Sequence, residues 1–294
     1  MAANLRAHRA SVQAALALNA DLGRLFAQVG TKAHPRGQII TAYRGARRAM
    51  RDVLRRGGRQ MEREAVEVLA GLRQQVGASA TLLLANATEA GARNGQRQAE
   101  ARGVRVVERP PVLLAPLATA WVAGVDVQIA GATAALQAGL DYEALLLGDA
   151  AAGQLGLLNP APVARSGAQW LAVAALLGWQ AELGGAPALV AGGWHKQAVA
   201  GLDERTTECC LRAHGQVVPF DADFVTTGSP AWAERQHWTP FHWWCRTAIC
   251  LVGPDEADDP LTREMQAAAQ AELRARQQTG TRATIHPAHS RSRR

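Results

Sequence analysis

Apolar residues recur at helical spacing through the first third of the chain, and this periodicity constrains the fold more than any other feature. In residues 3–29 the recurring positions are Leu5, Val12, Leu16, Leu22, Leu25 and Val29. Because residues three, four and seven apart share one face of an α-helix, the pattern predicts an amphipathic helix. A second helical stretch, 38–76, is rich in arginine and has a weak point at Gly57-Gly58; a third is expected over 78–101.

The positive charge of the chain is concentrated in this helical region. Residues 1–109 hold 19 Lys and Arg against 8 Asp and Glu, a net charge of +11, whereas the whole chain carries +7. A basic helical surface suits a polyanion, with DNA as the first candidate, and a solvated helix face is the alternative. The arginines that we expect to contact phosphate are Arg44, Arg47, Arg48, Arg51, Arg55, Arg56 and Arg59.

The pattern changes after a short strand expected over 103–111, where we place a domain boundary. Residues 112–193 are mostly alanine- and leucine-rich helix, clearest over 166–183, with Ser166 as a possible N-cap and Gly184-Gly185 as the end. The stretch 194–203 alternates like a strand, and turns, prolines and tryptophans follow it. Five of the eight tryptophans fall between Trp194 and Trp244, which indicates a small module with its own core.

The last part of the chain predicts one more helix and a basic tail. Asp259 is a suitable N-cap, Pro260 suits the first turn and Gly280 is a stop signal. We expect residues 281–294 to be disordered. The predicted fold class is α+β, predominantly α-helical. Its expected parts are a basic helical domain (1–110), a helical part with a small α+β module (111–254, motif core 194–252), and a helix with a basic tail (255–294).

Neither a secretory signal nor a membrane span is expected. The amino terminus lacks an apolar signal segment. The longest uncharged runs, 110–125 and 166–181, are shorter than the roughly 20 residues that cross a bilayer. Synthesis in a reducing cytosol then favours free thiols or metal ligands over disulfides.

All four cysteines lie between Cys209 and Cys250, and two histidines sit beside them at metal-ligand spacing. Cys210 and His214 are four residues apart, and His242 and Cys245 are three apart. Each pair would share one side of a helical turn, so the two pairs could close a tetrahedron around zinc, with Cys209 as an alternative ligand. A closed site with four protein ligands would be structural.

Two other interpretations of these residues stay open. The cysteines could be small buried hydrophobic residues packed beside histidine and tryptophan. Alternatively, a cysteine could be a nucleophile paired with His214 or His242. The signatures of zinc deaminases, zinc proteases, P-loop proteins and serine hydrolases do not occur. For Asp203 and Arg205 we expect a turn with an internal ion pair.

The residues around the cysteines resemble the phage Mu protein F-like, or phage head morphogenesis, family of minor head proteins. "LDERTTECCLRAHGQVVPFD" followed by "PFHWWCRT" is similar to the two-part signature of that family. The matching residues are Asp203, Arg205, Thr206, Cys210, His214 and Gly215 in the first half, and Pro240, His242, Cys245, Arg246 and Thr247 in the second. The similarity covers about residues 169–252. Thr207 and Thr247 stand where many members of the family have cysteine. A metal site built on the full set of family cysteines would therefore lack these ligands here.

The resemblance implies a structural virion component without catalytic activity. Minor head proteins of this kind bind the portal or the inner capsid during assembly, and some touch the DNA. We therefore expect the portal or major capsid protein and, non-specifically, phage DNA as partners. The expected location is the virion, in the capsid interior or at the portal vertex, after assembly in the host cytoplasm. One alternative is a host-directed effector. Another is a zinc-dependent, nuclease-like enzyme acting at packaging or ejection, with Asp203, Asp221 or Asp223 beside the metal.

Overall fold

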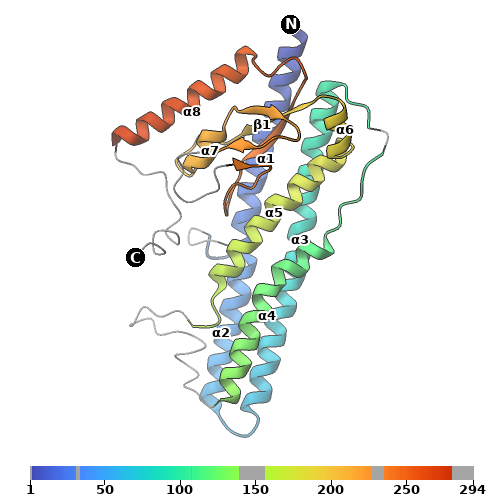
Figure 1. Ribbon diagram of the computed structural model, residues 1–294. Coiled ribbons are helices and arrows are strands. Elements are labelled where there is room, and N and C mark those ends of the chain that lie inside the picture. The colour runs from blue at the N-terminus through green and yellow to red at the C-terminus, as the bar shows by residue number, and fades with distance from the viewer. Residues whose placement is uncertain (1, 31–33, 107, 139–155, 227–234, 280–294) are drawn as a thin grey trace. The chain divides into compact units, whose positions relative to one another are not determined.

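The computed structural model describes residues 2–30, 34–106, 108–138, 156–226 and 235–279. The fold is predominantly α-helical with a small antiparallel sheet, as the sequence predicts (Figure 1). The chain forms two compact units. The sheet unit comprises Met1–Gly23, Ala87–Val112 and Ala172–Arg294, and the helical unit comprises Arg24–Asn86 and Leu113–Leu171. Each unit therefore combines segments from both sides of residue 110, near which the sequence suggested a boundary.

The first three helices follow the predicted pattern with one exception. They are α1 (Ala2–Val29), α2 (Gln38–Arg56) and α3 (Met61–Arg102). The stretch expected over 38–76 is divided at its predicted weak point, and α2 ends there because Gly57 and Gly58 adopt φ values of 60° and 90° that side-chain-bearing residues rarely adopt. The expected break between residues 76 and 78 is wrong, since α3 runs through Gly77. Val76 and Ala80 are fully buried there, and their packing outweighs the roughly 1 kcal/mol that a glycine costs in a helix.

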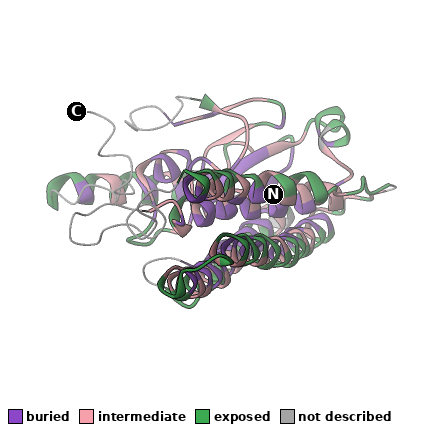
Figure 2. Ribbon diagram, turned by 90° about the horizontal axis from the view of Figure 1, so that it is seen from below, coloured by how far each residue is buried: buried purple, intermediate pink, exposed green. Residues whose placement is uncertain are grey.

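Helices α4 (Ala115–Gln137) and α5 (Pro160–Glu182) follow. Helix α5 begins six residues before the predicted start, because the side-chain oxygen of Asn159 accepts a hydrogen bond from the Ala161 N–H (3.0 Å). Its end is as predicted, with Gly184 and Gly185 at φ values of 80° and 81°. Within the helical unit, the Tyr43 hydroxyl donates to Gln128 Oε1 (2.8 Å) and so connects α2 to α4. Buried residues line one side of α2 and exposed residues the other, a pattern visible in the helices of Figure 2.

Among the described residues, α4 is the one helix long and apolar enough to cross a membrane by length and composition. Core helices of soluble proteins meet the same criterion. The expectation that the chain has no membrane span therefore stays a prediction.

The sheet unit is built around strand β1 (His195–Val199). It pairs antiparallel with β2 (Val217–Pro219) on one side and β5 (Ala248–Val252) on the other. Strands β3 (Phe224–Val225) and β4 (Arg235–Gln236) form a separate pair. Helices α6 (Ala186–Ala191), α7 (Glu208–Ala213) and α8 (Pro260–Thr279) complete the elements. Residues 103–106 and 108–111 form no strand, contrary to the prediction.

The core of the sheet unit contains the cysteines that the sequence singled out. Cys209, Cys210 and Cys245 lie in one buried cluster with aromatic and aliphatic residues from the helices and strands. Its aromatic members are Trp179, Phe220, Phe224 and Phe241. The module thus shares a substantial apolar core with α3 and α5, and the thiols contribute to it.

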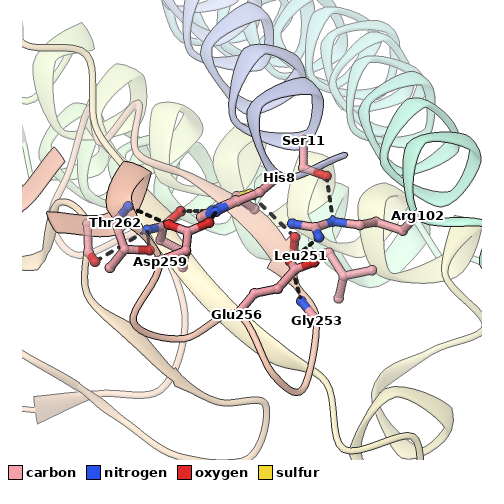
Figure 3. Close-up of polar contacts among 11 residues, drawn as sticks. His8, Ser11, Arg102, Leu251, Gly253, Glu256, Asp259 and Thr262 are labelled. Atoms are coloured by element: carbon pink, nitrogen blue, oxygen red, sulfur yellow. Dashed lines mark hydrogen bonds and ion pairs between the residues drawn. The ribbon is translucent and has the colours of Figure 1, made fainter. Parts of the chain in front are cut away.

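A buried polar network ties α1, α3 and α8 to the sheet (Figure 3). The fully buried His8 of α1 contacts Asp259 through Nδ1 (2.5 Å) and Gln197 Oε1 through Nε2 (2.8 Å). Arg102 of α3 pairs with Glu256 in the loop before α8. Asp259 caps α8 as predicted, accepting from the Thr262 N–H (2.7 Å). The predicted stop at Gly280 and the tail 281–294 lie outside the described residues.

Candidate metal centre

The loop that precedes α7 is organised by Asp203. Its Oδ1 accepts hydrogen bonds from the Arg205 N–H (3.0 Å) and the Thr206 hydroxyl (3.1 Å). The expected ion pair with Arg205 is wrong, because the carboxylate binds the guanidinium of Arg246 instead, at 2.7 and 2.6 Å. Burial by itself raises the pKa of Asp203, but the hydrogen bond and charge of Arg246 outweigh it and hold the pKa below its ordinary value. The two halves of the sequence motif are therefore joined at this ion pair.

Helix α8 holds the same loop from another side. The buried Arg276 donates to the carbonyl oxygens of Thr206 (2.6 Å) and Asp203 (2.9 Å), and its Nε lies 2.6 Å from Glu272. Sequence reasoning missed this role. An arginine in the last turn of a helix ordinarily indicates a favourable interaction with the helix dipole, and nothing local pointed to a loop 70 residues earlier.

Three predicted or alternative metal ligands come together where α7 meets the turn before β5. Cys209, Cys210 and His242 each place one donor atom within 4.8 Å of the others, and all three are buried. Cys210 Sγ lies 3.0 Å from His242 Nε2 and 3.7 Å from Cys245 Sγ. All four cysteines of the chain are free and buried. A group of this composition could hold a metal ion.

The structure does not bring His214 into this group. Helix α7 ends at Ala213, and His214 Nδ1 accepts a hydrogen bond from the Ala200 N–H (2.9 Å) instead. Burial lowers the pKa of His214 to about 4, so the ring is neutral at physiological pH. Gly215 follows at φ 77°, where an added Cβ would lie 2.9 Å from the backbone nitrogen of Gln266 in α8. The histidine and the glycine of the motif thus shape the turn after α7, and Cys209 takes the place that spacing had assigned to His214.

The electrostatics of the cluster favour thiolates. Burial by itself raises the pKa of Cys245, but the hydrogen bond from Cys210 and the positive charge of His242 hold this pKa well below its ordinary value. Burial opposes the charged form of His242 as well, yet the negative charge of Cys245 raises the pKa of the imidazole to about 9. The hydrogen bond from Cys210 lowers the pKa of Cys209 to about 7, whereas burial raises the pKa of Cys210 well above the usual range. The Cys210 thiol has one proton and donates to one of these neighbours at a time, which favours the thiolate, the metal-binding form, at that neighbour.

The orientation of His242 also fits a metal ligand. Its Nδ1 lies 2.6 Å from the carbonyl oxygen of Trp243, which can only accept, so this nitrogen carries the proton. Metal-binding histidines commonly donate their second nitrogen to a carbonyl or carboxylate in this way. Nε2 thereby faces the thiols, and its lone pair becomes available to a metal when the imidazolium releases its second proton. Sulfur with imidazole is a donor set that suits zinc and other borderline or soft metals.

Pro240, Thr247 and the nearby acids do not belong to the metal-binding group found among the described residues. The partly buried Pro240 and the buried Thr247 flank the segment of His242 and Cys245. Asp223 Oδ1 lies 3.1 Å from His237 Nδ1. Lys196, which the sequence did not single out, donates to the carbonyl of His237 (2.7 Å) and lies 3.7 Å from the centre of the Trp238 ring. Burial lowers the pKa of this lysine to about 8, against the charges of Asp223 and Asp221.

The predicted DNA-contacting arginines lie in the helical unit, on α2 and the turn after it. At about 100° per residue, Arg44, Arg48 and Arg55 fall opposite the buried stripe of this helix. Arg47 and Arg51 lie between that face and the buried stripe. Arg47 and Arg51 are partly buried, Arg44, Arg48, Arg55, Arg56 and Arg59 are exposed, and Arg56 pairs with Glu64 (2.5 Å). The arrangement presents a basic stripe about 16 Å long between residues 44 and 55.

Comparison with family models, with curated proteins and with solved structures finds no match for this chain.

Proposed function

We propose that this chain is a minor head protein of a bacteriophage, a structural virion component that binds the portal or the inner capsid during assembly. The observation that carries the proposal is the convergence of the two halves of the motif. Asp203 binds Arg246, and Cys210 contacts both His242 and Cys245, across more than 30 residues of chain. Since the comparisons find no relative, the proposal rests on these motif residues and on their common location.

We further propose that zinc is the metal, held by Cys209, Cys210, His242 and Cys245. Thiolate sulfur lies about 2.3 Å from zinc, so the edge between two sulfurs of a tetrahedral site is about 3.8 Å. The observed distance of 3.7 Å between Cys210 and Cys245 fits this edge. The bound ion would connect α7 to the turn before β5 and stabilise a module with short strands.

Burial of the ligands supports a structural role over the nuclease-like alternative. Catalytic zinc keeps a position open to water and substrate, whereas Cys209, Cys210 and Cys245 are 0%, 3% and 1% exposed. Asp203 and Asp223, two of the carboxylates considered for a nuclease, are engaged by Arg246 and His237. The basic stripe of α2 would contact the packaged DNA without sequence preference, through phosphate neutralisation.

Purification of phage particles from the producing cells tests the proposal. Quantitative mass spectrometry of proheads and mature heads should find the chain at a few copies per particle, far below the major capsid protein. A Cys245→Ser variant should be depleted from the particles, whereas a Cys250→Ala variant, which changes a thiol outside the motif, should be retained. Recovery of the wild-type chain only as free protein in the lysate would overturn the virion assignment.

A further inference from the structure

The hydroxyl of Thr207 is directed into the cysteine cluster rather than toward the helix that Thr207 caps. Thr207 is the N-cap residue of α7, but its side chain makes no capping hydrogen bond. A threonine at this position ordinarily accepts a hydrogen bond from the second or third N–H of its helix. Here Oγ1 lies 3.1 Å from Cys209 Sγ and 2.8 Å from His242 Nε2. The hydroxyl therefore contacts two members of the metal-binding group at once.

The Thr207 hydroxyl has a single proton, so it can donate one hydrogen bond at a time. Since Nδ1 of His242 donates to the Trp243 carbonyl, Nε2 is the nitrogen left to bind a metal. Before a metal binds, the Thr207 hydroxyl can hold the ring through Nε2. After a metal occupies the Nε2 lone pair, the single hydroxyl proton has only Cys209 Sγ as its acceptor among these contacts.

We infer that Thr207 is a positioning residue of the metal centre: its hydroxyl orients His242 before the metal binds and then donates a hydrogen bond to the Cys209 thiolate. The inference rests on the metal centre proposed above. Hydrogen bonds from outside the coordination sphere to metal ligands typically change metal affinity by about 10–100-fold. A hydrogen bond to a bound thiolate also withdraws electron density from sulfur, which raises the energy of sulfur-to-metal charge transfer.

The test uses the full chain with Co²⁺ as a spectroscopic probe and Zn²⁺ for affinity. Thr207→Val has nearly the same shape without the hydroxyl, and Thr207→Ser keeps the hydroxyl. We expect Thr207→Val to bind Zn²⁺ about 10–100-fold more weakly in chelator competition. Its cobalt–thiolate charge-transfer band should move to longer wavelength, while Thr207→Ser retains the wild-type band and affinity. A residue that only supported the fold would lower the amount of bound cobalt without moving the band.

The outcomes separate this inference from the metal centre itself. Wild-type protein that shows the cobalt–thiolate band, together with an unchanged band and affinity in Thr207→Val, would overturn the role of Thr207 and leave the metal centre standing. Wild-type protein without a thiolate band would overturn both. If Thr207→Val does not fold, Thr207→Ala replaces it, and equal bands in Thr207→Ala and Thr207→Ser would refute the inference.

Discussion

Asp203 and Arg246, 43 residues apart in the sequence, form an ion pair in which one guanidinium nitrogen contacts both carboxylate oxygens, at 2.7 and 2.6 Å. The pair joins the loop before α7 to the segment that enters β5. The backbone of the same loop is held by Arg276 of α8. Three separate parts of the sheet unit thus meet at one turn, and Cys209 and Cys210 follow it directly in the chain.

Removing the guanidinium should destabilise the sheet unit. Because the pair is partly exposed, we expect Arg246→Ala to lower the free energy of unfolding by about 1–2 kcal/mol. Urea denaturation provides the measurement. Arg205→Ala is the matched control, since within the described part of the chain the exposed Arg205 contacts Asp203 through its backbone N–H, which alanine keeps, and its effect should stay within about 0.5 kcal/mol. Equal stability of the two variants would contradict a structural role for the pair.

Loss of one thiol should release the metal. Cys245→Ser is expected to reduce bound zinc from about one equivalent to less than a tenth, because the remaining donors no longer close the tetrahedron. Elemental analysis of protein purified without chelator checks this. Hydrogen exchange should become faster in residues 201–226 and 235–250, and not in the helical unit. Cys250→Ala, which removes a buried thiol outside the group, should keep its zinc.

Acidification should lower the free energy of unfolding because His214 is buried in its neutral form. The pKa of His214 in the folded protein is about 4, below the ordinary value of 6.5. Between pH 4 and pH 6.5, therefore, His214 binds a proton in the unfolded chain and not in the folded chain. Stability from this residue is complete above about pH 6.5 and falls by about 2–3 kcal/mol as the pH drops toward 4. Urea denaturation of metal-free protein measures the loss. His214→Asn can still accept from the Ala200 N–H but does not titrate, so its stability should fall less over the same range.

Binding of duplex DNA should be weak, independent of sequence and steeply dependent on salt. Each phosphate neutralised by the α2 arginines contributes about −0.9 to the slope of log affinity against log salt. Replacing Arg44, Arg48 and Arg55 by glutamine should therefore reduce the slope by up to about 2.7. The matched control replaces Arg63, Arg73 and Arg93, which already pair with carboxylates. A folded wild-type chain that binds no DNA at low salt would refute the prediction.

The same glycine-to-alanine change should have opposite effects at two positions. Gly215→Ala forces a positive φ on alanine and places its Cβ 2.9 Å from the backbone of α8, so we expect a loss of more than about 1 kcal/mol. Gly45→Ala lies within α2 with nothing within 4 Å of the new Cβ and should gain up to about 1 kcal/mol. Thermal unfolding of both variants compares them directly. Loosening of the α7–α8 contact should accompany Gly215→Ala only.

Local features of the fold could be predicted because their physical causes are local. The end of α2 at Gly57-Gly58, the end of α5 at Gly184-Gly185 and the cap of α8 by Asp259 all depend on φ preference or on a side chain three residues from its partner. The start of α5 was misplaced because both Asn159 and Ser166 are acceptable caps. Only the structure shows that Asn159 forms the hydrogen bond.

The sequence by itself determined the helical class, the basic stripe of α2 and the concentration of thiols and imidazoles in one short module. The tertiary structure alone decided which of them meet. Spacing placed His214 beside Cys210 on the assumption that the helix continues, whereas α7 ends at Ala213 and the ring accepts a hydrogen bond from Ala200, the residue after β1. It likewise paired Asp203 with Arg205, although Arg246 is the partner. Spacing along a chain describes geometry over one or two turns, while contacts across 30 or more residues depend on how strands and helices pack.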